Sequence, residues 1–234
     1  MKRLHFNVDC GEGDSAVDAC ALETVDAINV AVGGHAGDPQ QARRLAANAQ
    51  ARGVAVHLHP SYPDRQHFGR RSLSLSWSAL AEALNRQRAV LPQVTVCKFH
   101  GALYNDAAGN PDLAAHLAEW LHEQGMHTVL TPPHSALAQA AQEWGIRVMR
   151  EGFADRAMTG SPPQLCLLSR SEEGAVFHHA EQVAQRLTDL QAGMVRTVNG
   201  ACYPWKVDTV CIHGDGPRAV ECMHRARLYK DASP

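Results

Sequence analysis

Val54-Ala-Val-His57-Leu-His59-Pro-Ser-Tyr62 joins a short apolar run to a group of polar side chains at its end. Residues 54–58 have the β-branched and apolar character of a buried strand in a parallel sheet. Six further runs of this kind follow the same pattern, at residues 4–8, 27–31, 94–97, 128–131, 147–149 and 209–212. We therefore expect seven short strands.

Alanine-rich segments between these strands carry signals for helix ends. They open at Asp38-Pro39, Asn110-Pro111 and Asp215-Gly-Pro217, and the first two close at Gly53 and Gly125. A capping side chain followed by proline marks a helix start, and glycine marks a helix end. Asp38 and Asp215 are therefore expected to be helix N-caps. Strands that alternate with helices predict either an open doubly wound sheet or a barrel.

Polar clusters at the ends of five predicted strands favour the barrel. Besides residues 57–62, these clusters are residues 7–12, 33–38, 98–101 and 213–215. Catalytic side chains of a parallel barrel come from the ends of many strands, whereas an open sheet gathers its ligand near one switch point. The sequence predicts one α/β domain over residues 1–234, a seven-stranded (β/α) barrel that is incomplete or distorted relative to eight strands.

Size, charge and cysteine content narrow the class of protein. The chain has 234 residues, 45% of them hydrophobic, and shows no shift in composition, which suits one substantial domain. Its formal net charge of -2, without blocks of like charge, favours neither nucleic acid nor membrane as a partner and points to a small ligand. No signal peptide or membrane-spanning run is recognisable, so the expected location is cytoplasmic.

Seven scattered cysteines without a C-x-x-C pair are typical of reduced thiols. The chain also lacks the phosphate-binding G-x-x-x-x-G-K-[ST] loop, an initial G-x-G-x-x-G, H-E-x-x-H and G-x-S-x-G. Standard nucleotide-binding, zincin and serine-hydrolase interpretations therefore lose support.

Carboxylates at the end of the first strand are the first candidate site residues. Asn7 and Asp9 lie two residues apart and so share a face of the strand, and Glu12 follows them. Paired carboxylates can act as an acid and a base, or hold a cation. Capping by Asp9 and solvation of Glu12 form the alternative interpretation.

Histidines follow three other strands. His35 lies among small residues that let a ligand approach the backbone, while His59 and His213 are expected to point into the barrel. His57 shares a face with His59, and its assignment to site or framework stays open. Two histidines of one strand can contribute to a metal site but supply two ligands at most.

Lys98 is one of only four lysines, against eighteen arginines, and it ends an apolar strand. A desolvated ammonium group there requires a carboxylate or an anionic ligand nearby. His100 shares its face, and Tyr104 is expected to be a wall residue.

Two arginine-containing segments complete the candidates. Arg70 and Arg71 are adjacent in a loop and would suit carboxylate or phosphate oxygens, with a solvated surface pair as the alternative. Asp155 and Arg156 follow the sixth strand, either as binding residues or as an internal ion pair.

Seven motifs in order along the chain carry a resemblance to a known family. They are residues 7–12, 29–39, 59–64, 68–71, 98–105, 153–156 and 211–215. Together they resemble the LamB/YcsF family, whose characterised activity is that of the A-type subunit of 5-oxoprolinase. The resemblance implies a distorted seven-stranded (β/α) barrel related to glycoside hydrolases and polysaccharide deacetylases.

The resemblance also implies a reaction, which is the ATP-dependent opening of 5-oxoproline to glutamate together with partner subunits B and C. The expected cofactor is ATP, and a divalent metal requirement stays open. Cations would hold the substrate carboxylate and the transferring phosphate, namely Lys98, Arg70 and Arg71. Carboxylates and histidines would position water, namely Asp9, Glu12, His59 and His100. The remaining expected substrate-binding residues are Asn7, His35, Asp155, Arg156 and His213.

Some positions depart from the family pattern. The family usually has Asp, Cys, Phe, Pro and Tyr where this chain has His5, Val32, Gly34, Phe99 and Met158, and it has Gly in place of His57. Residues 160–168 also differ. We expect reshaped pocket walls, which would suit another lactam or cyclic amide or would weaken activity. Two alternatives remain: a metal-dependent hydrolase or deacetylase using Asp9, His35, His59 and His100, and a non-catalytic subunit that binds a small acid.

Overall fold

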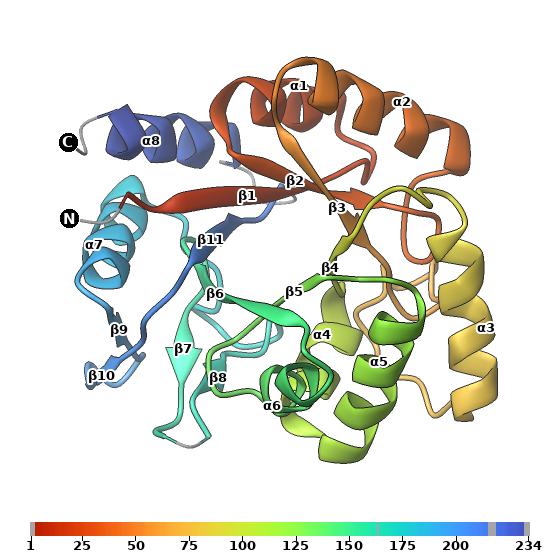
Figure 1. The fold of residues 1–234 in the computed structure, drawn as a ribbon. Helices are drawn as coiled ribbons and strands as arrows, with labels where there is room; N and C mark the ends of the chain where they lie inside the picture. Colours follow the sequence, from red (N-terminus) through yellow and green to blue (C-terminus); the bar gives the residue numbers. More distant parts are fainter. Residues whose placement is uncertain (1–2, 163, 215–218, 232–234) are drawn as a thin grey trace.

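Seven parallel strands close into a barrel in the order β1-β11-β6-β5-β4-β3-β2 (Figure 1). The computed structural model describes residues 3–162, 164–214 and 219–231. The barrel strands are β1 (His5–Cys10), β2 (Ala27–Ala31), β3 (Ala55–His59), β4 (Val96–Lys98), β5 (Thr128–Thr131), β6 (Arg147–Phe153) and β11 (Thr209–Ile212). The predicted strands and the barrel are confirmed. Because β1 pairs with both β2 and β11, seven strands leave no open edge.

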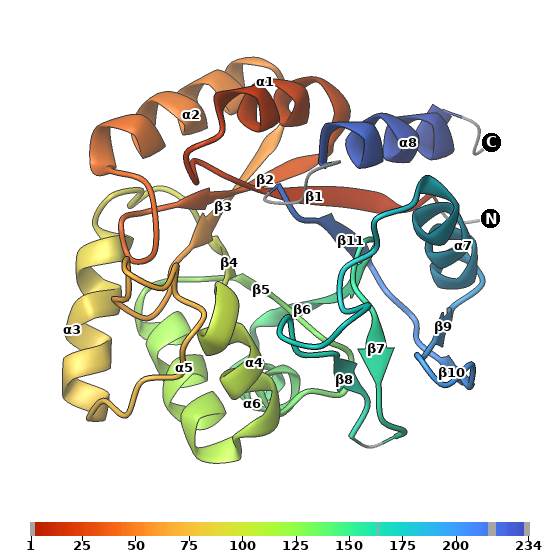
Figure 2. The same cartoon turned by 180° about the vertical axis from the view of Figure 1, so that it is seen from behind.

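Helices surround this barrel (Figures 1 and 2). They are α1 (Ser15–Thr24), α2 (Pro39–Ala51), α3 (Trp77–Arg88), α4 (Gly101–Gly109), α5 (Pro111–Glu123), α6 (Ala136–Glu143), α7 (Ala180–Gln191) and α8 (Ala219–Asp231). The carboxylate of Asp38 accepts hydrogen bonds from the N–H groups of Gln40 and Gln41, which confirms its N-cap role. Asp215, the other expected cap, lies outside the described residues.

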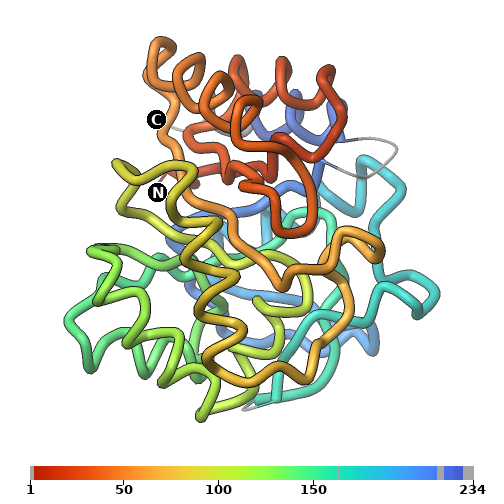
Figure 3. The backbone as a smooth tube through the Cα atoms, turned by 90° about the vertical axis from the view of Figure 1, so that its right-hand side faces the viewer, coloured from red at the N-terminus to blue at the C-terminus, as the bar shows by residue number. Residues whose placement is uncertain are grey.

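The connection from β6 to β11 is the longest excursion from the barrel. It contains α7 and two small antiparallel pairs, formed by β7 (Met158–Thr159) with β8 (Cys166–Leu167) and by β9 (Met194–Arg196) with β10 (Cys202–Pro204). Seen from the side, the loop after β3 and part of this connection lie at the same end of the barrel (Figure 3). Both contribute to the cavity described below.

Alternate residues of each strand face opposite sides of the sheet. On β1, Phe6 and Val8 pack in the apolar layer beneath the helices, while Asn7 and Asp9 face the barrel interior. Barrel interiors are usually filled by branched apolar side chains. In this barrel many interior positions are polar and almost fully buried, namely Asn7, Asp9, Asn29, His57, His59, Lys98, Glu151 and Thr209. Such groups are tolerated only when they bond to one another.

The seam between β3 and β4 has the shortest ladder in the barrel. The two strands pair at one register position, Leu58 opposite Cys97. Bonds from the neighbouring loop and a side chain reinforce the seam. His59 Nδ1 donates to the main-chain oxygen of Lys98 at 2.7 Å, and the His100 N–H donates to Pro60 at 2.8 Å.

All seven cysteines are free thiols, as predicted. Four of them are buried, namely Cys10, Cys97, Cys211 and Cys222. A search of the described residues finds no helix with the length and apolar character needed to cross a membrane.

Candidate active site

A cavity of about 590 Å³ opens at the carboxyl ends of the barrel strands. Its volume lies in the range of small-molecule sites. Eight predicted site residues line it: Asp9, Glu12, His59, Arg70, Lys98, His100, Arg156 and His213. The structure thus brings the distant motifs together at one end of the barrel, as predicted. The chemical role of each residue stays a prediction.

Four other predicted residues do not line the cavity. Asn7 lies beneath its floor, and Asp155 lies behind His213. His35 packs behind His100. Arg71 is exposed on the loop after β3.

The first part of the site is the lysine centre, which we define as Asn7, Asp9, Asn29, Lys98, Glu151 and Cys211. Lys98 Nζ lies 2.8 Å from Asp9 Oδ1, 3.2 Å from Glu151 Oε1 and 3.0 Å from Cys211 Sγ. Burial favours the neutral amine, but the carboxylates of Asp9 and Glu151 outweigh it and hold the Lys98 pKa well above its usual range. Lys98 therefore stays an ammonium ion.

Two amides orient the carboxylates of this centre. Asn29 Nδ2 donates to Asp9 Oδ1 at 2.7 Å and to Asn7 Oδ1 at 2.6 Å. Asn7 Nδ2 in turn donates to Glu151 Oε1 at 3.0 Å. Burial alone would raise the Asp9 pKa, but the positive charge beside it, that of the Lys98 ammonium group, holds it below its usual range. Asp9 is thus a fixed, ionised carboxylate.

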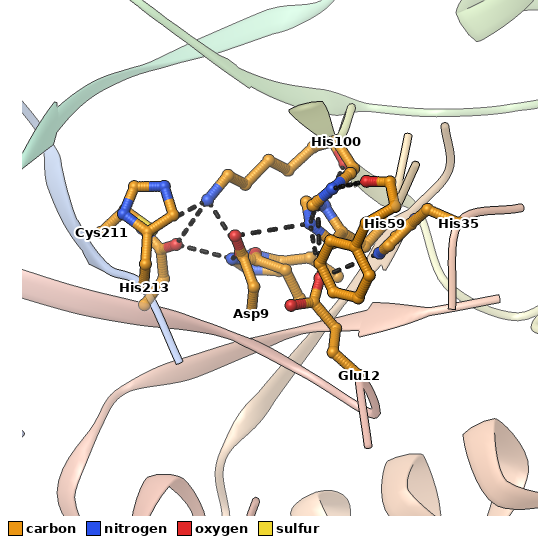
Figure 4. Close-up of polar contacts among 12 residues, drawn as sticks. Asp9, Glu12, His35, His59, His100, Cys211 and His213 are labelled. Atoms are coloured by element: carbon orange, nitrogen blue, oxygen red, sulfur yellow. Dashed lines mark hydrogen bonds and ion pairs between the residues drawn. The ribbon is translucent and has the colours of Figure 1, made fainter. Parts of the chain in front are cut away.

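The second part is the histidine centre, which we define as Glu12, His35, His59 and His100 (Figure 4). His59 Nδ1 bonds to the main-chain oxygen of Lys98, and His100 Nε2 bonds to that of Phe68 at 3.0 Å. A carbonyl oxygen only accepts, so each of these nitrogens carries a hydrogen. The other two ring nitrogens, His59 Nε2 and His100 Nδ1, face each other at 3.0 Å.

Glu12 and His35 complete the histidine centre. Glu12 Oε1 lies 3.4 Å from His100 Nδ1 and 3.8 Å from His59 Nε2. His35 Nε2 lies 2.9 Å from the same oxygen, and its ring stacks on His100 with centroids 3.6 Å apart and planes 3° apart. Burial lowers the His35 pKa, so the neutral ring donates its Nε2–H to Glu12.

A glycine lets the loop after β3 approach these rings. Gly69 has a φ of +63°, and a Cβ there would lie 2.9 Å from His35 Cβ and 3.1 Å from His100 Cδ2. Only glycine combines that backbone conformation with so close an approach. This conformation of Gly69 lets the main-chain carbonyl oxygen of Phe68 reach His100.

His213 and Asp155 form a separate pair at the cavity wall. His213 Nδ1 donates to Asp155 Oδ1 at 2.9 Å, and the His213 main-chain N–H donates to Oδ2 at 3.2 Å. Burial would raise the Asp155 pKa, but His213, Arg170 and Arg156 hold it below its usual range. The bond at Nδ1 leaves His213 Nε2 as the proton-accepting nitrogen of the neutral ring.

The arginines differ in their contacts. Arg156 donates to the main-chain oxygens of Ala175 at 3.2 Å and Leu168 at 2.6 Å, so it anchors the long connection beside the cavity. The Arg70 guanidinium lies over the Phe68 ring, 4.9 Å from its centroid, and lines the cavity.

Glu151, Asn29 and Cys211 were not among the predicted site residues. Each occupies an inward-facing strand position, and Asn29 lies opposite both Asp9 and His57 in the parallel register. For Glu151 and Asn29, a charged or amide side chain within an apolar strand was the available signal, whereas Cys211 resembles an ordinary small core residue. Arg170 also lines the cavity, from the long connection, and no sequence pattern pointed to it.

Of the six departures from the family pattern, only Phe99 lines the cavity. The differing segment 160–168 also contributes Cys166, Leu167 and Leu168 to the wall, so the expectation of reshaped walls applies to Phe99 and to these three residues. Gly34 shows how another departure is accommodated. A Cβ at Gly34 would lie 2.2 Å from Gln87 Oε1, because Gln87 fills this space and bonds to Ser61 in both directions at 2.9 Å. His57 is buried and donates to Asn29, and burial lowers its pKa to about 3.

The fold and cavity together define a (β/α) barrel with a polar, histidine- and carboxylate-lined site at the carboxyl ends of its strands. The LamB/YcsF family model matches residues 4–233, and the chain belongs to this family.

Individual relatives agree with this assignment. The chain is 36% identical to a 5-oxoprolinase A-type subunit of Pseudomonas syringae pv. tomato, over 97% of this chain and 93% of that protein. A lactam utilization protein from Thermus thermophilus superposes with a TM-score of 0.84 at 29% identity, over 98% of this chain and 96% of that one. A GH18 chitinase from Pseudoalteromonas aurantia shares the fold alone, with a TM-score of 0.51 at 8% identity, over 95% and 99% of the two chains.

Proposed function

We propose that this chain is the A-type subunit of an ATP-dependent 5-oxoprolinase that opens 5-oxo-L-proline, or a related lactam, to L-glutamate. It would act as a hydrolase of a cyclic amide together with subunits B and C. The observation that carries the proposal is the buried Lys98 ammonium group at the floor of a cavity that also exposes His213 and Arg70. The names of the relatives supply the substrate.

A lactam resists hydrolysis because its amide carbon is a poor electrophile. Transfer of a phosphoryl group from ATP to the lactam oxygen makes that carbon reactive. Water then adds to the carbon, the ring C–N bond breaks and the nitrogen takes a proton. A second water releases phosphate from the resulting acyl phosphate, so that 5-oxoproline, ATP and two waters yield glutamate, ADP and phosphate.

Lys98 would bind an oxygen of the substrate or of the transferring phosphate. An ammonium group has three N–H donors, and those of Lys98 face Asp9, Glu151 and the thiol of Cys211. Sulfur is the weakest acceptor of the three. A substrate oxygen would therefore displace the Cys211 contact and leave both carboxylates in place. Arg70 and Arg156 would add cationic contacts nearer the cavity mouth.

His213 would remove the proton from the attacking water. Asp155 holds its Nδ1–H, so Nε2 is the basic nitrogen, as in other pairs of a base and an orienting carboxylate. Asp9, Glu12, His59 and His100 line the cavity as well and would orient the water.

The test is reconstitution with subunits B and C, measuring ATP hydrolysis and glutamate release across a panel of lactams. We expect ATP hydrolysis that depends on 5-oxoproline and on all three subunits. Lys98→Ala should lose it, while Lys206→Ala, at an exposed lysine, should keep it. Calorimetry with ATP on this chain and on its partners would locate the nucleotide.

Two results would contradict the proposal. One is the absence of coupling between any lactam and ATP in the complete mixture. The other is ATP-independent hydrolysis of an amide by this chain alone, which would support the metal-dependent hydrolase.

A further inference from the structure

We infer that Glu12, His59 and His100 form a binding site for one divalent transition metal ion of the zinc class, with a coordination position open toward the cavity. The inference stands on the geometry of the histidine centre and does not depend on the proposed reaction.

The hydrogen bonds of the two rings create the need for a cation. Main-chain carbonyl oxygens of Lys98 and Phe68 fix hydrogens on His59 Nδ1 and His100 Nε2. In the neutral rings the opposite nitrogens then carry lone pairs, and these point at each other across 3.0 Å. The carboxylate oxygen of Glu12 adds a third electron donor to the same space. A metal ion converts this repulsion into coordination.

The spacing of the three donor atoms fits such an ion. The pairs His59 Nε2 to His100 Nδ1, Glu12 Oε1 to His100 Nδ1, and Glu12 Oε1 to His59 Nε2 measure 3.0, 3.4 and 3.8 Å. Ligands about 2.0–2.1 Å from a tetrahedral zinc ion lie about 3.3 Å from each other. Two imidazoles and a carboxylate with a fourth position open is the donor set of catalytic zinc sites. All three residues line the cavity, so that position faces it.

His35 is a positioning residue rather than a ligand. The four donor atoms of Glu12, His35, His59 and His100 all lie within 4.8 Å of one another. However, the His35 ring lies parallel to His100, with centroids 3.6 Å apart. A metal ion lies in the plane of each imidazole that binds it, and one ion cannot lie in two stacked planes. His35 instead donates to Glu12, which orients the carboxylate.

Each proposed ligand thus has its own outer partner. His59 bonds to the Lys98 carbonyl, His100 to the Phe68 carbonyl and Glu12 to His35. Metal-binding histidines and carboxylates characteristically have such partners, which fix their tautomer and orientation.

A neighbouring group of possible ligands, Asp9, Cys211 and His213, does not support the same inference. The ammonium group of Lys98 already lies 2.8 Å from Asp9 Oδ1 and 3.0 Å from Cys211 Sγ. Lys98 supplies the positive charge there, whereas the histidine centre contains no cationic lysine or arginine of its own.

The experiment is titration of the full chain, purified without a metal-affinity tag and stripped by chelator, with Co²⁺ and then Zn²⁺. We expect one Co²⁺ per chain, with the intense visible absorption of a four-coordinate ion, and its displacement by one Zn²⁺. These readouts need no activity and no partner subunit, so failure here and failure of the proposed reaction are distinguishable.

Variants assign the ligands. His100→Ala and Glu12→Gln should abolish stoichiometric binding, whereas His35→Ala should weaken it by about 10- to 100-fold, as expected for an outer partner. His127→Ala, at an exposed histidine, should bind like the wild type. If a variant fails to fold, X-ray absorption of the wild-type Co²⁺ complex still reports two nitrogen ligands of the imidazole type and carboxylate oxygen.

Three results would overturn the inference. They are no binding to the wild type, full binding by the folded His100→Ala chain, and a proton shared between His59 and His100, seen by nuclear magnetic resonance, that persists in saturating Zn²⁺.

Discussion

The lysine centre and the histidine centre meet where Asp9 Oδ2 lies 3.5 Å from His59 Nε2, yet they balance their charges in opposite ways. In the lysine centre, one buried ammonium group faces Asp9, Glu151 and a thiol. In the histidine centre, the N–H groups of His59 and His100 turn outward to carbonyl oxygens, while their lone pairs and the Glu12 carboxylate turn inward. One barrel thus contains a cluster that has its own cation beside a cluster arranged to bind a cation from outside.

Removing the Lys98 ammonium group should have the largest effect on the free energy of unfolding. Lys98→Met leaves Asp9 and Glu151 buried without their counter-ion, and breaking a buried pair in this way costs about 3–5 kcal/mol. We expect the free energy of unfolding, measured with urea, to fall by about that amount. Adding Glu151→Gln should recover part of the loss. A change below about 1 kcal/mol would mean that Lys98 is not the counter-ion.

Supplying the external cation should stabilise the protein through the other centre. At a Zn²⁺ concentration of about 100 times the dissociation constant, the free energy of unfolding should rise by about 2.7 kcal/mol. Thermal or urea unfolding with and without Zn²⁺ measures this gain. The gain should vanish in His100→Ala and survive in His127→Ala. Equal gains in all three proteins would place the ion elsewhere.

The Asp155–His213 pair offers a third case, in which a carboxylate is paired with a titratable ring. The Asp155 pKa is lowered by folding, so its contribution is complete above the pKa of the unfolded chain, about 3.9, and is lost as pH falls through the folded pKa. Asp155→Asn should cost about 1.5–3 kcal/mol at neutral pH.

The matching measurement is urea unfolding of the wild type and of Asp155→Asn from pH 7 to pH 3. The difference between them should narrow below about pH 4. A constant difference over that range would show that the ionised form of Asp155 is not what stabilises the fold.

Substitution of the neighbouring residues Arg70 and Arg71 should have the smallest effect, which we expect on substrate binding. Arg70 lines the cavity, whereas Arg71 does not. Arg70→Ala should raise the KM for the lactam or ATP about 5- to 10-fold, equivalent to about 1 kcal/mol, because an exposed charge contributes little. Arg71→Ala should change KM less than 2-fold, about 0.4 kcal/mol. Equal effects would remove the distinction between the two side chains.

The fold was accessible from the sequence because its signals are local. Short apolar and β-branched runs marked all seven barrel strands, and Asp38 before Pro39 marked the start of α2. The residues at the strand ends were accessible for the same reason, since the carboxyl ends of parallel strands meet at one mouth.

What escaped prediction depends on relations across the barrel. Asn29 joins the site because β1 and β2 pair in the register that sets it opposite Asp9, and no local pattern encodes that register. Arg70 and Arg71 differ only because Phe68 and Gly69, both with positive φ, turn the loop between the cavity and the surface. The facing lone pairs of His59 and His100 follow from carbonyl positions, which a sequence does not display.

The seam between β3 and β4 links ligand binding in the cavity to the stability of the barrel. Its ladder has one register position, and the His59 ring bridges it. Opening of the barrel at this seam would separate His59 from the Lys98 carbonyl and disperse the histidine centre. A ligand at that centre should therefore slow hydrogen exchange of the β4 amides, far more than those between β2 and β3, where five register positions pair. Occupancy of the cavity and closure of the barrel would then be linked equilibria.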